Sequence, residues 1–139
     1  MIHLYCGKRG TGKSKALIKL ANEKVEQCRG TLVYIDDDSK MAFSLHRDVR
    51  FISTQEYNLK SCSDFYGFIC GIISKDYDLE DVFVDGLFNI ISENLEKTED
   101  LLERLQEISN KNNFNIHMNI TIKEGVPAFF NKYNLVIKE

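Results

Sequence analysis

The stretch Ile2-His3-Leu4-Tyr5-Cys6-Gly7-Lys8-Arg9-Gly10-Thr11-Gly12-Lys13-Ser14 decides the fold of this chain. Its first part, Ile2–Cys6, is mostly apolar and runs straight into glycine, which predicts a short strand followed by a tight loop. After Lys13 the apolar residues recur every three or four positions, which predicts an amphipathic helix that Gly30 closes. The residues of this apolar stripe are Leu17, Leu20, Ala21, Val25 and Cys28.

Strands and helices alternate along the rest of the chain. Apolar or alternating runs predict strands, and runs with a helical period predict helices. The expected strands are Thr31–Ile35, Arg50–Ser53, Asp81–Gly86, Asn115–Lys123 and Asn134–Lys138; the expected helices are Ser63–Ser74 and Phe88–Asn110, with short helical turns in Ser39–His46 and Pro127–Lys132. This alternation predicts an α/β fold, a three-layer α/β/α arrangement around a mostly parallel sheet of about five to six strands.

The composition indicates one globular domain, residues 1–139. The chain has 43% apolar and 28% charged residues and a net charge of −3, so we expect no broad nucleic-acid-binding surface. No apolar stretch is long enough to span a bilayer, and Lys8 and Arg9 come too early for a secretory signal. The cysteines lack metal-ligand spacing, which favours reduced, mostly buried thiols in the cytoplasm. They are Cys6, Cys28, Cys62 and Cys70.

The glycine-rich loop fulfils the pattern G-x-x-x-x-G-K-[ST], which is typical of phosphate binding. Glycines let successive backbone N–H groups point inward, and the N-terminus of the following helix favours anions. The pattern assigns Lys13 to the outer phosphates of a nucleoside triphosphate and the Ser14 hydroxyl to Mg²⁺. Lys8, Arg9 and Lys15 add positive charge, although a solvated surface position is the simpler interpretation of Lys15. The expected phosphate-binding set is Gly7, Lys8, Arg9, Gly10, Thr11, Gly12, Lys13, Ser14 and Lys15.

Two acidic residues follow predicted strands and are candidates for the chemistry. Asp85 ends the apolar run Val82–Val84, and a parallel sheet would deliver it to the carboxyl edge, where it would orient the metal ion. The alternative is that Asp85 and Gly86 form only a strand-ending turn. Asp36 ends the strand after the first helix and is the candidate catalytic base; the alternative is that the acidic run Asp36–Asp38 is a solvated turn.

These residues resemble the additional-strand branch of P-loop NTPases, which includes the RecA-like ATPases. The resemblance rests on the loop GKRGTGKS, the strand VFVD and the later strand NIHMNITI. In that branch a further strand lies between the loop strand and the strand of the metal acid, and its polar tip senses the γ-phosphate. The resemblance gives this place to Asn115–Thr121, with Thr121 or Lys123 at the tip. RecA-like members also carry an acidic catalytic residue, typically glutamate, at the position of Asp36.

The chain also resembles short stand-alone P-loop proteins of Gram-positive bacteria that are often labelled as ATP-binding or twitching-motility-ATPase-like. A pilus retraction motor is far longer and has an N-terminal domain and histidine and acidic boxes that this chain lacks. Many ATPases carry a glutamate directly after the metal acid to polarise the attacking water, and here that residue is Gly86. Either hydrolysis is slow, or the base comes from elsewhere.

We expect ATP with Mg²⁺ as the ligand, because the N-K-x-D motif with which GTPases read guanine is missing. Three functions stay open: an ATPase that is weak or depends on a protein partner or a second copy, a nucleotide sensor with little turnover, and a small-molecule kinase or nucleotide-group transferase. In an oligomer, a neighbour's Arg47, Arg50 or Arg104 would stabilise the transition state.

Aromatic residues and histidines give weaker signals. Tyr34, Tyr57 or Tyr133 are candidates for stacking on adenine, although a packing role is the simpler interpretation. The three histidines of the chain are scattered, and we expect packing or surface roles for them rather than metal binding.

Overall fold

Six strands form one sheet in the computed structural model, which describes residues 1–139. In spatial order they are β3 (Val49–Ser53), β2 (Thr31–Asp36), β4 (Leu79–Asp85), β5 (Asn115–Thr121), β1 (Ile2–Gly7) and β6 (Asn134–Lys138). Every neighbouring pair is parallel. The predicted α/β class and the mostly parallel sheet are confirmed, and the sheet is parallel throughout.

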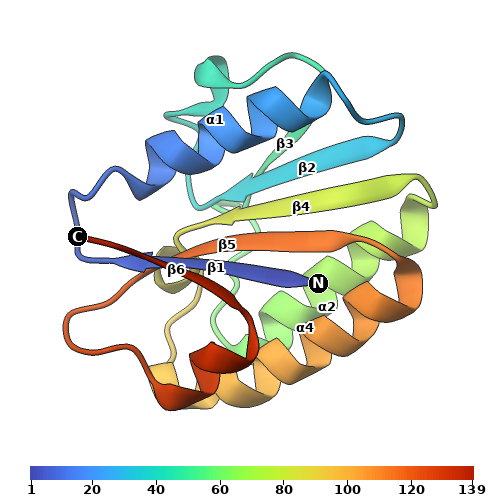
Figure 1. The fold of residues 1–139 in the computed structure, drawn as a ribbon. Helices are drawn as coiled ribbons and strands as arrows, with labels where there is room; N and C mark the ends of the chain where they lie inside the picture. The colour runs from blue at the N-terminus through green and yellow to red at the C-terminus, as the bar shows by residue number, and fades with distance from the viewer.

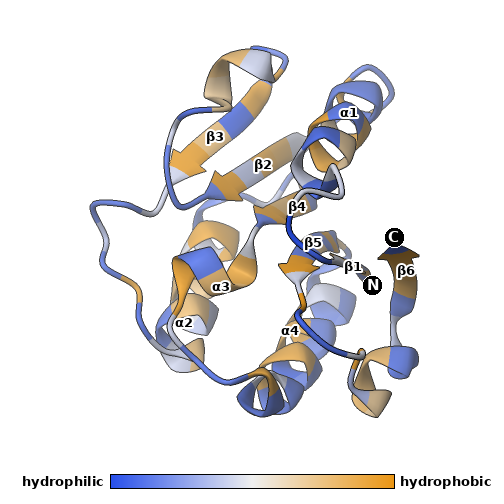
Figure 2. Cartoon of the chain, turned by 90° about the vertical axis from the view of Figure 1, so that its left-hand side faces the viewer, coloured by the Kyte–Doolittle hydropathy of each residue, from blue (hydrophilic) through white to orange (hydrophobic).

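Helices cover both faces of this sheet (Figure 1). Helix α1 (Lys13–Val25) lies on one face, and α2 (Cys62–Lys75) and α4 (Thr98–Asn112) lie side by side on the other, with the short α3 (Leu87–Ile90). Figure 2 views the sheet from the carboxyl ends of its strands, with β3 and β6 at the two edges. The predicted three-layer arrangement is therefore confirmed.

Each face of the sheet has its own apolar core. On the α1 side, Leu17, Ile18 and Ala21 of the helix pack on a small buried cluster of strand residues, which are Leu32, Tyr34, Val49 and Phe83. On the other side, a larger cluster joins the remaining strand residues to α2, α3 and α4. Burial of apolar surface on both faces explains the continuous apolar runs Leu32–Ile35 of β2 and Val82–Val84 of β4.

The predicted helix Phe88–Asn110 is wrong in its first third. Helix α3 ends at Ile90, and a 3₁₀ turn at Leu95–Lys97 leads into α4. Ile91 is extended and buried in the core, and the next residue, Ser92, donates its N–H to the Lys60 carbonyl at 2.8 Å. Tertiary contacts of this segment therefore override its helical period. Acidic residues in the first turn of α4 favour the new start, since the positive end of the helix dipole lies there.

Helix α1 is shorter than predicted, while the shorter elements agree well. It ends at Val25, so Cys28 lies in the turn before β2. The turn expected in Ser39–His46 is a 3₁₀ helix at Ala42–Ser44, and Pro127 precedes another at Ala128–Lys132. None of the helices has the length and apolar character that crossing a membrane requires.

The strand order brings four strand ends together. Strand β5 lies between β1 and β4, which is the place that the resemblance gave to Asn115–Thr121. Asp36 at the end of β2 lies opposite Asp85 at the end of β4, and Gly7 at the end of β1 lies opposite Thr121 of β5. The carboxyl edge of the sheet therefore collects the loop after β1 and both candidate acids.

The larger core predicts a stability difference between two apolar truncations. Leu102→Ala removes a fully buried side chain from α4 and should lower the free energy of unfolding by about 2–5 kcal/mol. Ile137→Ala, on the half-exposed edge strand β6, should cost less than about 1 kcal/mol. Urea denaturation of both variants measures this difference, and equal losses would contradict the assignment of the core.

Candidate functional site

The loop between β1 and α1 has a backbone that glycine allows. Gly10 and Gly12 have φ angles of 83° and 79°, in the left-handed region that glycine adopts without steric cost. From Lys8 to Lys15, no backbone N–H group donates to a carbonyl of the chain. The Thr11 hydroxyl closes the loop by donating to the Lys8 carbonyl at 2.9 Å. The loop is therefore an ordered turn with a run of free donors at the start of a helix.

Lys13 lies folded back over this loop. Its Nζ donates to the Lys8 carbonyl at 2.7 Å and to the Thr11 hydroxyl at 3.4 Å, and its side chain is largely buried. Burial lowers the pKa of the Lys13 ammonium, and the charge of Lys138 adds to this effect, while Cys6 and Asp85 oppose it. The ammonium of Lys13 is thus held at the loop by two uncharged oxygen atoms and has no carboxylate partner within hydrogen-bond distance.

The carboxylate of Asp85 is buried and accepts three side-chain hydrogen bonds. The Ser14 hydroxyl donates to its Oδ1 at 2.9 Å, and the Asn119 amide donates to the same oxygen at 2.8 Å. The Tyr34 hydroxyl donates to Oδ2 at 2.7 Å. The Asn119 carbonyl oxygen in turn accepts the N–H of Gly86, the residue that follows Asp85. These contacts fix the orientation of the Asp85 carboxylate at the end of β4.

A pocket of about 450 Å³ lies at the carboxyl edge of the sheet, and Ser14, Asp85 and Asn119 line it together with the glycine-rich loop. Three cationic side chains line it, those of Arg9, Lys13 and Lys15, and Asp85 is the only acidic residue of the lining. The other lining residues are Gly10, Gly12, Ser14, Met41, Gly86, Asn89, Asn119 and Thr121. The balance of charge in the pocket favours an anion.

Most of the predicted phosphate-binding set lines this pocket. Gly7, Lys8 and Thr11 do not, since Gly7 ends β1 and the other two shape the loop through their mutual hydrogen bond. Lys15 lines the pocket although it is exposed. Of the two residues expected at the tip of β5, Thr121 lines the pocket and Lys123 does not.

Asp36 is buried but does not line the pocket. Its Oδ1 accepts the N–H of Asp37 at 2.7 Å. Burial, chiefly, and then the side chain of Asp37 and the charge of Asp85 raise the pKa of Asp36 to about 8, although the backbone N–H of Asp37 acts in the opposite direction. At neutral pH the Asp36 carboxyl therefore carries a proton. The carboxylates of Asp36, Asp37 and Asp38 approach within 4.8 Å of one another.

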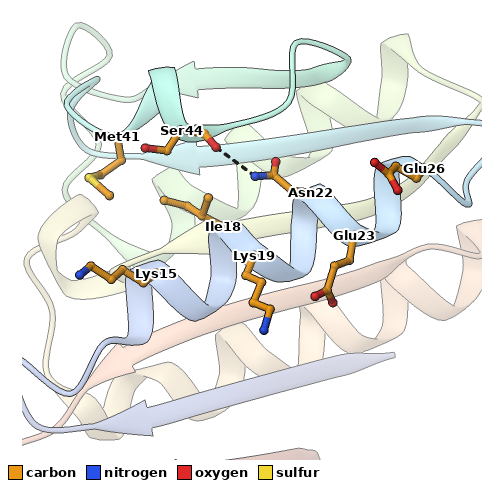
Figure 3. A pocket seen from close by; sticks show the side chains of 8 residues that line it. All are labelled: Lys15, Ile18, Lys19, Asn22, Glu23, Glu26, Met41 and Ser44. Atoms are coloured by element: carbon orange, nitrogen blue, oxygen red, sulfur yellow. Dashed lines mark hydrogen bonds between the residues drawn. The ribbon is translucent and has the colours of Figure 1, made fainter.

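A second hollow of about 510 Å³ adjoins the pocket and shares Lys15 and Met41 with it. It lies between α1 and the turn at Met41–Ser44, as Figure 3 shows. Ile18 and Met41 are its apolar residues, and polar side chains form the rest of the lining, among them Lys19, Asn22, Glu23 and Glu26. The Asn22 amide donates to the Ser44 carbonyl at 3.0 Å and accepts the His46 N–H at 2.8 Å, which fixes the turn on the helix.

The arginines and aromatic candidates lie elsewhere. Arg50 pairs with Asp76 at 3.5 Å, and Arg104 lies 3.9 Å over the ring of Tyr66; neither these two nor Arg47 lines the pocket. Tyr34 is fully buried, so it is closed to a stacking ligand, while Tyr57 contacts Phe68 and Tyr133 packs against the larger core. Base stacking on Tyr34 is therefore wrong.

The histidines take packing or surface positions, whereas the prediction for the cysteines is met only in part. His117 pairs with Asp81 at 2.7 Å and stacks on His3 and Phe83. The four cysteines are free thiols; only Cys6 is fully buried, and burial raises its pKa to about 12. The expectation of mostly buried thiols is thus met at one of four positions.

Four residues that support or line the site were not predicted from the sequence: Tyr34, Asn119, Asn89 and Met41. Tyr34 and Asn119 sit inside strands two residues before a candidate residue, where alternation puts them on the same face as Asp36 and Thr121. That alternation is the signal that would have found them. Asn89 and Met41 gave no signal, because the short helix α3 brings Asn89 to the pocket and the loop after β2 brings Met41 there.

The chain matches no protein-family model and no curated protein sequence.

The protonated state of Asp36 predicts a pH dependence of stability. A carboxyl whose pKa is raised from its usual value of about 4 to about 8 binds its proton more tightly in the folded state than in the unfolded state. The contribution of Asp36 to the free energy of unfolding therefore falls as the pH rises from about 4 to 8. Asp36→Asn cannot lose a proton, so its melting temperature relative to wild type should rise across this window. Thermal denaturation between pH 4 and 9 measures it.

The exposed Asp78 provides the control, and Asp78→Asn should follow the wild-type curve. Parallel curves for Asp36→Asn and wild type would show that the Asp36 carboxyl is ionised throughout the range.

Proposed function

We propose that this protein binds ATP with Mg²⁺ in the pocket beside the glycine-rich loop, as a P-loop nucleotide-binding domain, and that it is a weak or partner-dependent ATPase. One observation carries the proposal: the unpaired N–H groups from Lys8 to Lys15 lie at the start of α1, beside the ammonium of Lys13. Backbone donors, a helix dipole and a lysine that converge on one pocket favour a polyanion of the size of a phosphate chain.

The metal part of the proposal rests on the donor set at Ser14 and Asp85. A hydroxyl and a carboxylate 2.9 Å apart line the pocket together, and both are hard oxygen ligands of the kind that Mg²⁺ prefers. Mg²⁺ keeps water and substrate phosphates among its ligands, so two protein oxygens suffice. When bound, the ion would neutralise phosphate charge, and Ser14 and Asp85 would hold it or its water shell.

The second hollow supports a nucleotide rather than a small phosphate ion as the ligand. It opens beside the phosphate pocket across Lys15 and Met41, and its apolar residues Ile18 and Met41 offer a surface for a base or ribose. The amide of Asn22 is already used in two hydrogen bonds to the neighbouring turn. Asn22 thus supports the shape of this hollow and is not free to read the edge of a base.

The charges around the pocket favour slow turnover. Its only acid, Asp85, is committed to Ser14, Tyr34 and Asn119, and no glutamate follows it to polarise a water molecule. Asp36 would serve as the base only after losing its proton, above a pH of about 8, and after a rearrangement that brings it into the pocket. Arg9 is the only arginine that lines the pocket. Arg47, Arg50 and Arg104 do not reach the pocket of their own chain, so they would act at the transition state only from a second copy.

A nucleotide sensor with little turnover is the second candidate, and the lack of a pocket base favours it directly. A small-molecule kinase or nucleotide-group transferase is the third candidate. It would need a binding site for the phosphate acceptor, and the second hollow could serve as that site only if the adenine of ATP binds elsewhere.

The first test removes the ammonium. Lys13→Ala should abolish ATP binding in calorimetry, because the variant loses the only lysine whose Nζ lies folded over the free N–H groups. Lys111→Ala, on the exposed end of α4, is the matched control and should bind ATP as the wild type does. An unchanged ATP affinity in Lys13→Ala would refute nucleotide binding at this loop.

The second test follows phosphate from γ-labelled ATP with and without a pool of metabolites. Slow release in buffer alone supports the ATPase, transfer only in the presence of the pool supports the transferase, and neither supports the sensor. If Asp36 is the base, release should increase as the pH passes about 8, because the carboxyl then ionises. Asp36→Asn should bind ATP but lose this increase, and equal turnover in variant and wild type would remove Asp36 from the mechanism.

A further inference from the structure

The ring of Tyr34 is held from both sides within the sheet. Tyr34 is fully buried on β2, and it stacks on Phe51 of β3 and on Phe83 of β4, with ring centroids 6.4 and 6.0 Å away. Its neighbours leave the ring no room to turn out of the sheet. The hydroxyl group therefore has a fixed place, and at that place it donates to Oδ2 of Asp85 at 2.7 Å.

Asn119 holds the other side of the same carboxylate. Its amide nitrogen donates to Oδ1 at 2.8 Å, while its carbonyl oxygen accepts the N–H of Gly86. Tyr34 on β2 and Asn119 on β5 flank Asp85 on β4, so the two neighbouring strands fix both oxygens of one carboxylate. Oδ1 also accepts the hydroxyl of Ser14, and both Ser14 and Asp85 line the pocket.

We infer that Tyr34 and Asn119 are positioning residues for Asp85, which set the orientation of its carboxylate toward Ser14 and thereby the affinity of the nucleotide site for Mg²⁺. This inference rests on the proposed function. Groups that hydrogen-bond a metal-binding carboxylate commonly change metal affinity by about 10- to 100-fold when they are removed. Burial of the Tyr34 hydroxyl, which also raises its pKa, keeps it a hydrogen-bond donor at every working pH.

The two residues differ in what else they touch. Asn119 lines the pocket, so its loss would also alter contacts to a bound nucleotide. Tyr34 does not line the pocket, and its hydroxyl reaches the site only through Asp85. Tyr34→Phe therefore isolates the positioning effect, since it removes one oxygen atom and keeps the stacked ring.

The experiment titrates Mg²⁺ into mixtures of the protein and a fluorescent ATP analogue, starting from EDTA. The affinity of the wild-type protein for the ATP analogue should increase as Mg²⁺ is added. Tyr34→Phe should show an affinity in EDTA close to that of wild type, but it should need about tenfold more Mg²⁺, or more, to reach the same increase. Tyr5→Phe removes a hydroxyl from the same face of the sheet that does not bond Asp85, and it should follow the wild type.

A double-mutant cycle separates positioning from a general loss of stability. In an Asp85→Asn background, Tyr34→Phe should cause no further shift in the Mg²⁺ midpoint, because the carboxylate that it positions is gone. If Tyr34 only supported the fold, Tyr34→Phe would lower the affinity for the ATP analogue to the same extent with and without Mg²⁺. Should Tyr34→Phe fail to fold, Asn119→Ser tests the other support, and its Mg²⁺ midpoint should shift in the same direction.

The outcomes distinguish this inference from the proposed function. An Mg²⁺ midpoint in Tyr34→Phe, or in Asn119→Ser where it is used, that equals the wild-type value overturns the positioning role and leaves nucleotide binding intact. A wild-type protein that fails to bind the analogue, or that ignores Mg²⁺, overturns the proposed function and the inference with it.

Discussion

A carboxylate that is only 5% exposed has to be hydrogen-bonded, and the site depends on how Asp85 meets this requirement. Its three side-chain donors come from three different elements: Ser14 from α1, Tyr34 from β2 and Asn119 from β5. These contacts exist only if β4 lies between β2 and β5 and if α1 begins next to the end of β4. The order of the strands and the position of the loop are thus tied to a single buried charge.

Much of the rest of the fold could be predicted, because it depends on local features of the sequence. Strands that are buried on both faces are apolar along their length, as Val82–Val84 are, and such runs identify themselves in the sequence. The glycine-rich loop is equally readable, because the left-handed backbone at Gly10 and Gly12 requires particular residues at particular places. Alternating strands and helices then lead to the parallel three-layer arrangement.

Features that depend on contacts between distant parts of the chain could not be predicted from the sequence. The break between α3 and α4 comes from the burial of Ile91 and from the hydrogen bond of Ser92 to Lys60, neither of which leaves a local signal. Tyr34 illustrates the same limit at the site. An aromatic residue in a β-rich run indicates packing, and its ring does pack between Phe51 and Phe83, but the bond of its hydroxyl to Asp85 is known only once β2 and β4 are paired.

The pairing of β2 with β4 has a further consequence for the chemistry of this edge. Because Asp36 and Asp85 lie opposite each other, two acidic residues share one low-polarity region, and ionising both there is costly. Asp85 receives three hydrogen-bond donors from side chains, whereas the carboxyl of Asp36 receives only the N–H of Asp37. Burial and the charge of Asp85 raise the pKa of the Asp36 carboxyl, so that carboxyl keeps its proton at neutral pH. In the proposed complex, Mg²⁺ next to Asp85 would lower the electrostatic cost of ionising Asp36, so that binding of the metal and nucleotide would itself bring the candidate base closer to its active form.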